Sequence, residues 1–123
     1  MRTISTLNEV IERVDKVKPN TYDDNTKADW IYRMEGRLRR EVIKENPPQQ
    51  YVDPDDNDKE LLVGYPYDNM YDYYLMAMIS YQDKEYGDYN NAIQMFENIY
   101  EEHAKWYIRM NRPKSDGSFK YGY

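Results

Sequence analysis

The sequence lacks several residues on which enzyme chemistry commonly depends. It has no cysteine, which excludes disulfide bonds, thiolate metal sites and cysteine nucleophiles. It has one histidine and only five glycines, and the glycines are scattered. A serine–histidine triad would therefore lack its usual partners, and a glycine-rich phosphate loop is absent. These gaps predict a protein that is not an enzyme and that uses no cofactor.

Long apolar runs are also missing. No segment approaches the length needed to cross a bilayer. The N-terminal residues 1–16 carry charge where a signal peptide would need an apolar core. We therefore expect a soluble protein that is intracellular when made and has no contact with a membrane.

Aliphatic residues are scarce. Leu, Ile, Val and Phe together number 21 of 123 residues, which is below the usual range for a globular domain. Fifteen Tyr, seven Met and two Trp supply the remaining large apolar surface. Tyr buries an aromatic ring and keeps a polar tip, so it suits a thin core or an interface. The composition predicts a small, adaptable core. Contacts with partner proteins would complete this core.

Charge is unevenly distributed along the chain. The net charge is −6, yet residues 112–123 hold three basic residues and one acidic residue. An acidic body disfavours nonspecific binding of nucleic acid, because a binding face must neutralise phosphates. We expect one helical domain over residues 1–111, followed by a basic C-terminal tail that docks on a partner.

Apolar residues at helical spacing predict four helices, over residues 6–18, 26–45, 67–85 and 88–110. Thr6 and Glu9 have the spacing of a capping box, and Thr26 is a candidate cap for the second helix. Because so few residues separate the last two helices, they should form an antiparallel hairpin. The predicted fold is all-α, a four-helix bundle-like domain with a long connector between helices 2 and 3 and an extended C-terminal tail.

The connector, residues 46–66, contains four prolines and the acidic run 53–58. A calcium loop would need glycine and glutamate at its sixth and twelfth positions, where Asp58 and Gly64 stand instead. A solvated acidic loop is favoured. Residues 60–63 resemble a strand or extended segment, whose partner would be residues 51–52 or another subunit.

Four cationic residues share one face of the second predicted helix: Arg33, Arg37, Arg40 and Lys44. The simpler interpretation is a solvated face paired with Glu41 and Glu45. The functional interpretation is a self-assembly stripe. It would meet the acidic loop of a neighbouring copy, and head-to-tail repetition would close a ring. The acidic partners would be Asp53, Asp55, Asp56, Asp58 and Glu60.

The single histidine, His103, lies on the apolar side of the fourth predicted helix. Carboxylates are absent from positions 99 and 106, so a metal site is disfavoured and a packed or interfacial histidine is expected.

Tyrosine is more abundant than one small core requires. We expect Tyr71, Tyr74 and Tyr100 in the core. The remaining tyrosines of interest are expected at least in part at interfaces: Tyr65, Tyr67, Tyr73, Tyr81, Tyr86 and Tyr89.

Residues 26–110 carry a pattern of packing residues around a Pro-Tyr-Asp helix start. The pattern comprises Leu61 to Asp68, Tyr71, Tyr73, Tyr74, Leu75, Ala77, Ile79, Glu85, Tyr89, Asn90, Asn91, Met95, Phe96 and Tyr100, with Trp30, Ile31, Gly36 and Arg37 upstream. It resembles head–tail connector (neck or adaptor) proteins of tailed bacteriophages.

The resemblance implies a helical adaptor, made in the bacterial host cytoplasm and located at the head–tail junction of the virion. Such proteins assemble as a ring, commonly of twelve copies, on the portal protein. They present a platform to the next neck or tail protein, and DNA only passes through their channel. By the same resemblance a C-terminal segment docks on the portal, here through Lys114, Phe119, Lys120, Tyr121 and Tyr123. The alternative is a small helical protein-binding or regulatory module of phage or prophage origin.

Overall fold

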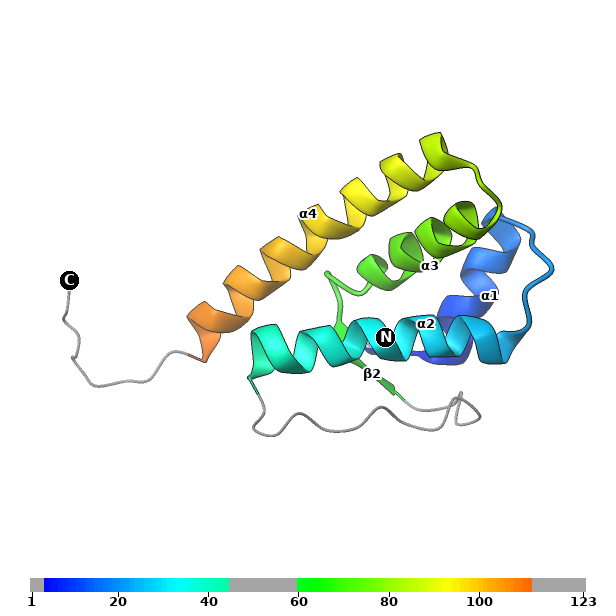
Figure 1. Cartoon of the computed structure of the whole chain (residues 1–123). Helices are drawn as coiled ribbons and strands as arrows, with labels where there is room; N and C mark the ends of the chain where they lie inside the picture. The colour runs from blue at the N-terminus through cyan, green and yellow to red at the C-terminus, as the bar shows by residue number, and fades with distance from the viewer. Residues whose placement is uncertain (1–3, 45–59, 112–123) are drawn as a thin grey trace, which may run out of the picture.

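The computed structural model describes residues 4–44 and 60–111, and most of them are helical, which confirms the all-α prediction (Figure 1). The elements are β1 (Ile4–Thr6), α1 (Leu7–Val17), α2 (Asp24–Leu38), the π-helical turn η1 (Arg39–Ile43), β2 (Glu60–Gly64), α3 (Asn69–Gln82) and α4 (Tyr86–Met110).

The predicted capping box begins α1. The Thr6 hydroxyl accepts the Glu9 N–H at 3.3 Å, and the Glu9 carboxylate accepts the Thr6 N–H at 2.9 Å. Leu7 and Val14 lie on the buried face of this helix. Val17, in its last turn, is exposed at the rim of the apolar stripe.

The second helix begins two residues before the predicted start. Asp23 is the N-cap in place of Thr26, and its carboxylate accepts the Thr26 N–H at 2.9 Å. At its other end the helix widens into η1 and stops at Lys44, which has a left-handed backbone with φ of 65°. A methyl group on Gly36 would meet no atom within 4 Å, so this glycine serves no close helix contact.

The strand expected over residues 60–63 is present as β2, but the prediction of its partner was wrong. β2 pairs with β1 in antiparallel register, with Ile4 opposite Gly64 and Thr6 opposite Glu60. The chain runs extended into the N-cap of α1, so its own N-terminal segment provides the neighbouring strand. Residues 51–52 lie outside the described part of the chain.

Helix α3 is the centre of the fold. It packs against α4, α1 and α2, and it forms the predicted antiparallel hairpin with α4 (Figure 1). Its buried residues point in more than one direction, so its apolar surface is wider than the single stripe we predicted. These residues are Met70, Tyr71, Leu75, Ala77, Ile79 and Ser80.

A buried carboxylate connects this centre to α2 and β2. Glu35 is 5% exposed, and its Oε2 accepts the Tyr71 hydroxyl at 2.6 Å and the Leu62 N–H at 2.8 Å. The same hydroxyl oxygen accepts the Val63 N–H at 2.9 Å. Burial, together with the adjacent Glu35 carboxylate, raises the pKa of Tyr71 well above its usual value. The network fixes β2 against the core.

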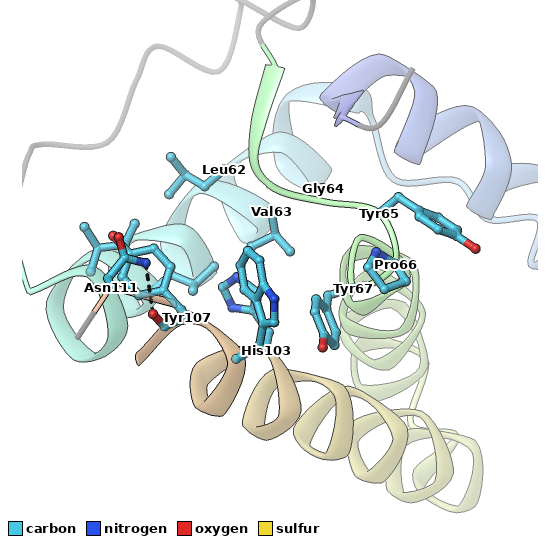
Figure 2. A pocket seen from close by; sticks show the side chains of 12 residues that line it. Leu62, Val63, Gly64, Tyr65, Pro66, Tyr67, His103, Tyr107 and Asn111 are labelled. Carbon is cyan, nitrogen blue, oxygen red and sulfur yellow. Dashed lines mark hydrogen bonds between the residues drawn. The ribbon is translucent and has the colours of Figure 1, made fainter. Parts of the chain in front are cut away.

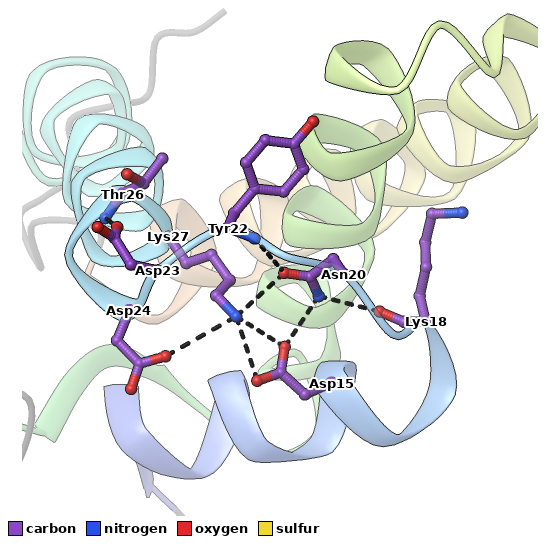
Figure 3. Close-up of polar contacts among 8 residues, drawn as sticks. All are labelled: Asp15, Lys18, Asn20, Tyr22, Asp23, Asp24, Thr26 and Lys27. Carbon is purple, nitrogen blue, oxygen red and sulfur yellow. Dashed lines mark hydrogen bonds and ion pairs between the residues drawn. The ribbon is translucent and has the colours of Figure 1, made fainter.

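A second polar cluster fixes the corner between α1 and α2 (Figure 3). The ammonium group of Lys27 is 2.8 Å from Asp15 Oδ1 and 3.2 Å from Asn20 Oδ1, and Asp24 lies 3.8 Å away. Lys27 is almost fully buried, so these oxygens replace the water that its charge has lost. The Asn20 amide donates in turn to Asp15.

Removing the Tyr71 hydroxyl tests the Glu35 network. Tyr71→Phe keeps the buried ring but leaves the Val63 N–H and one Glu35 contact unsatisfied. We expect the free energy of unfolding, measured in urea, to fall by about 1–3 kcal/mol. The control is Tyr81→Phe, an exposed position where the expected change is within about 0.5 kcal/mol. Equal effects of the two substitutions would contradict the role given to the network.

Candidate functional site

A concave pocket of about 490 Å³ lies between β2, the β2–α3 turn and the C-terminal half of α4 (Figure 2). Its volume falls in the range of natural ligand sites. The lining is mainly apolar and aromatic. The lining residues are Leu38, Ile43, Leu62, Val63, Gly64, Tyr65, Pro66, Tyr67, His103, Trp106, Tyr107 and Asn111.

Aromatic rings from two elements form the wall of the pocket. The ring centroid of Tyr67, in the turn before α3, is 5.5 Å from that of His103 and 5.9 Å from that of Trp106. His103 and Trp106 are themselves 5.8 Å apart on successive turns of α4. Trp106 is 38% exposed, so it lies at the mouth, whereas His103 lies at the base.

His103 has an unusual environment for a polar side chain. It is 5% exposed, which confirms the sequence prediction of a packed or interfacial histidine. Its Nδ1 is buried and has no hydrogen-bond partner within residues 4–44 and 60–111. Burial lowers the pKa of His103 below its usual value, so the ring is neutral at pH 7. A neutral imidazole offers one nitrogen acceptor and one N–H donor.

Large apolar side chains remain exposed beside the pocket. Tyr65 and Trp106 line it, and Met110 follows Trp106 by one turn of α4, on the same side of the helix. All three side chains are more than a third exposed. We refer to Tyr65, Trp106 and Met110 as the pocket-end patch. Grouped exposed apolar residues are typical of sites where a protein binds a partner.

A second exposed group lies at the opposite end of the α3–α4 hairpin. Val17, Tyr81, Tyr86 and Met95, which we call the tip patch, are all more than a third exposed. Val17 and Met95 line a shared hollow of about 320 Å³. The ring of Tyr81 is 5.8 Å from that of Tyr86. The molecule therefore has apolar surface at both ends of its central hairpin.

Arg37, from the predicted cationic stripe, makes contacts within the chain. Its guanidinium binds Glu41 at 2.9 Å and Glu97 at 3.1 Å, and its Cζ lies 4.1 Å from the Tyr100 ring centroid. The hydroxyl of Tyr100 donates to the same Glu41 at 2.9 Å. The pairing with Glu41 was predicted from helical spacing, whereas the contact with Glu97 in α4 was not. Arg37 therefore joins η1 to α4.

The other predicted self-assembly residues are only partly described. Arg33 binds Asp29 at 2.8 Å, and Arg40 and Lys44 are exposed at the end of η1. Of their predicted acidic partners, Glu60 is exposed at the start of β2. The others lie outside the described residues, as do all the predicted portal-docking residues. These residues are Asp53, Asp55, Asp56 and Asp58, and Lys114, Phe119, Lys120, Tyr121 and Tyr123. The self-assembly role of the stripe stays a prediction.

The tyrosine predictions divide in the structure. Tyr71 and Tyr100 are buried as predicted, and Tyr74 is half-buried, with its ring packed 5.0 Å from that of Phe96. Of the six tyrosines predicted in part at interfaces, three are exposed and three are half-buried, and their interface role stays a prediction. The exposed ones are Tyr65, Tyr81 and Tyr86, and the half-buried ones are Tyr67, Tyr73 and Tyr89.

Sequence reasoning missed Lys27 and Glu35, the two buried charges of α2. Their positions were informative. Glu35 is four residues after Ile31 and three before Leu38, on the buried face itself.

Comparison with known proteins identifies no relative: no family model matches the chain, and neither a curated protein nor a solved structure is similar to it. Among the described helices, none has the length and apolar character required to cross a membrane. Within the same residues, His, Asp and Glu side chains form no group of three arranged to hold a metal ion.

The buried state of His103 predicts a pH effect. Because the folded protein holds its pKa below 6.5, the unfolded chain takes up a proton first as the pH falls. The stabilising contribution is thus fully present above pH 6.5 and is lost as the pH falls through the folded pKa. A titration of the His103 ring protons by NMR should give a midpoint below 6.5. His103→Gln should flatten the change in unfolding free energy between about pH 7 and 5. A midpoint at or above 6.5 would show that the ring is not desolvated as described.

Arg37 provides a matched test of the contact between η1 and α4. Arg37→Lys keeps the charge but loses the planar fork and the stacking on Tyr100, so we expect a loss of about 1 kcal/mol of unfolding free energy. Arg33→Lys makes the same chemical change where the side chain is 73% exposed, and should cost less than about 0.5 kcal/mol. Thermal or urea unfolding measures both, and similar losses would argue against a special role of Arg37.

Proposed function

We propose that this protein is a head–tail connector of a tailed bacteriophage. It forms a ring on the portal protein at the head–tail junction of the virion and links the head to the next neck or tail protein. Two lines of support are independent of each other. One is the resemblance carried by residues 26–110, and the other is the distribution of exposed apolar surface on the folded chain.

The single observation that carries the proposal is the pair of patches at opposite ends of the hairpin. A closed ring needs a heterologous contact, in which each chain offers two different surfaces to its two neighbours. The pocket-end patch and the tip patch are such a pair, one concave and one at a helix turn. Aromatic and Met side chains, which dominate both patches, are enriched at protein interfaces.

In this proposal the protein acts through its shape and its contacts with neighbouring proteins, without catalysis and without a cofactor. Burial of Trp106, Met110 and the exposed tyrosines between subunits supplies the energy of assembly. The overall acidic charge suits a channel through which DNA passes, because a surface of negative charge does not hold the phosphate backbone.

The alternative is a small helical module that binds one partner as a monomer or dimer. The pocket supports this alternative, because a site of about 490 Å³ is large enough to receive a side chain of one partner. The two readings differ in the use of the tip patch, which only the ring requires.

The test is deletion of the gene in the phage or prophage that carries it, followed by electron microscopy of the lysate. We expect complete heads and complete tails that remain separate. Supplying the wild-type protein should restore joined particles, whereas Met110→Asp, which places a charge in the pocket-end patch, should not.

The matched control is Asn98→Asp, which adds the same charge at an exposed position of α4 outside both patches, and which should restore joining. Normal infectious particles in the absence of the gene would contradict the connector function. The regulatory alternative would then be pursued through its binding partner.

A further inference from the structure

We propose that the chain's own C-terminal residues 119–123 cover the aromatic pocket, with the ring of Tyr121 packed against Trp106. The contact itself does not depend on the proposed function, whereas its consequence for assembly rests on it. The inference assigns an occupant to the pocket. It also gives the aromatic residues of the basic tail, residues 112–123, a binding site within their own chain.

The described part of the chain leaves the apolar walls of the pocket open. Trp106 is 38% exposed, and Tyr67, Tyr107 and Leu62 are half-buried. Water against a concave apolar surface is unfavourable, so a segment that covers these side chains lowers the free energy of the chain. Aromatic walls favour a further ring packed against their faces and edges. The pocket therefore selects an aromatic occupant.

The tail begins at the wall of the pocket. Asn111, the last described residue, lines the pocket, and residues 112–123 follow it directly. Pro113 opposes a continuation of α4, because proline has no N–H and its ring clashes with the preceding helical turn. Ten residues of chain span up to about 33 Å, so Tyr121 has ample reach to return to the pocket. A segment tethered beside its site also binds at a high effective concentration.

The centre of the tail carries a signal for chain reversal. Asp116-Gly117 is among the strongest sequence signals for a two-residue β-hairpin turn. A two-residue turn at this position brings Tyr121 opposite Arg112. Because Arg112 is the residue that follows Asn111, the returning chain arrives beside the pocket wall.

The residues after the turn alternate between aromatic and other side chains. Successive side chains of an extended segment point to opposite faces, so Phe119, Tyr121 and Tyr123 share one face. Lys120 and Gly122 lie on the other face. The tail thus offers a row of three rings to the aromatic walls and keeps its lysine directed away from them.

A second segment adjoins the pocket but is a poor occupant. Residues 45–59 connect the chain after Ile43 to the strand that carries Leu62, and both of these residues line the pocket. This segment has five acidic residues and a single aromatic residue, Tyr51. Burial of carboxylates in an apolar pocket is costly, which favours the tail.

The covered surface overlaps with the pocket-end patch. Trp106 lines the pocket and belongs to that patch, and Met110 lies one turn further along α4. A neighbouring chain that uses the patch must therefore displace the tail. The tail is also the segment that the family resemblance assigns to the portal protein. A chain whose tail binds the portal would have its pocket free for a neighbour.

Cross-linking within one chain tests the placement, and the absence of cysteine makes it unambiguous. Tyr65→Cys lies at the exposed rim of the pocket, and Gly122→Cys lies beside Tyr121 without removing it. In the full-length double variant, a short bis-maleimide should give a cross-linked single chain, identified by mass spectrometry. The control replaces Tyr65→Cys by Gly87→Cys, which lies in open space at the other end of the 25-residue α4 and should give no such product.

Trp106 reports whether the tail covers it. In a Trp30→Phe background Trp106 is the only tryptophan. Removal of residues 112–123 should raise its quenching by acrylamide about twofold, because the covered ring becomes 38% exposed. Tyr121→Ser in the full-length chain should give most of this increase. Lys120→Ser, on the opposite face, is the matched control and should leave quenching unchanged.

Self-association connects the contact to assembly. Removal of residues 112–123 should strengthen self-association by about tenfold, measured by sedimentation, because a neighbour no longer has to displace the tail. Unchanged or weaker association would overturn the role of the tail in assembly.

The outcomes separate the contact from the function. A cross-link that joins two chains instead of one, or quenching of Trp106 that truncation leaves unchanged, overturns the tail-in-pocket contact and leaves the connector proposal standing. Normal phage particles without the gene remove the connector proposal, whereas the cross-link and the quenching still decide the contact.

Discussion

The buried Glu35 carboxylate is the interaction on which the candidate site depends. It accepts the Tyr71 hydroxyl from α3 and the Leu62 N–H from β2, so one side chain of α2 joins three elements. β2 leads directly into residues 65–67, which form one wall of the aromatic pocket. The other wall, on α4, is held to η1 by Arg37 through Glu97 and the Tyr100 ring. The polar contacts of Glu35 and of Arg37 thus hold the two walls of the pocket in place.

The shortage of aliphatic residues explains why so much aromatic surface remains outside. Half of the apolar side chains of α3 are buried, and this helix packs against α1, α2 and α4 at the centre of the core. The long α4 has only Phe96, Tyr100 and His103 fully buried in its 25 residues, and its two ends extend along the surface with Tyr86 and Trp106 exposed. A small domain of this composition gains further burial only from a partner, which connects the fold to the proposed assembly.

The sequence predicted those features of the fold that local patterns of residues determine. The spacing of Thr6 and Glu9 gave the cap of α1, and the apolar periodicity of residues 67–110 gave the hairpin and the buried position of His103. Contacts between residues distant in the sequence could not be predicted from such local patterns. The pairing of β2 with β1 depends on the tertiary path of the N-terminus, and the contact of Arg37 with Glu97 spans 60 positions. The pocket combines residues from α2 to α4, so the sequence of no single segment predicts it. The burial of Glu35 could have been predicted, because its position falls on the buried face of α2.

The central claim is that the pocket-end patch and the tip patch are the two halves of one repeated contact. The most direct measurement is the mass in solution of two single-patch variants, Met110→Asp and Tyr86→Asp, alone and mixed. The account predicts that wild-type protein exceeds two chains of 15.0 kDa each, that each variant alone stays at one chain, and that the equimolar mixture stops at two. A mixture that stays at one chain, or variants that assemble like the wild type, would contradict it.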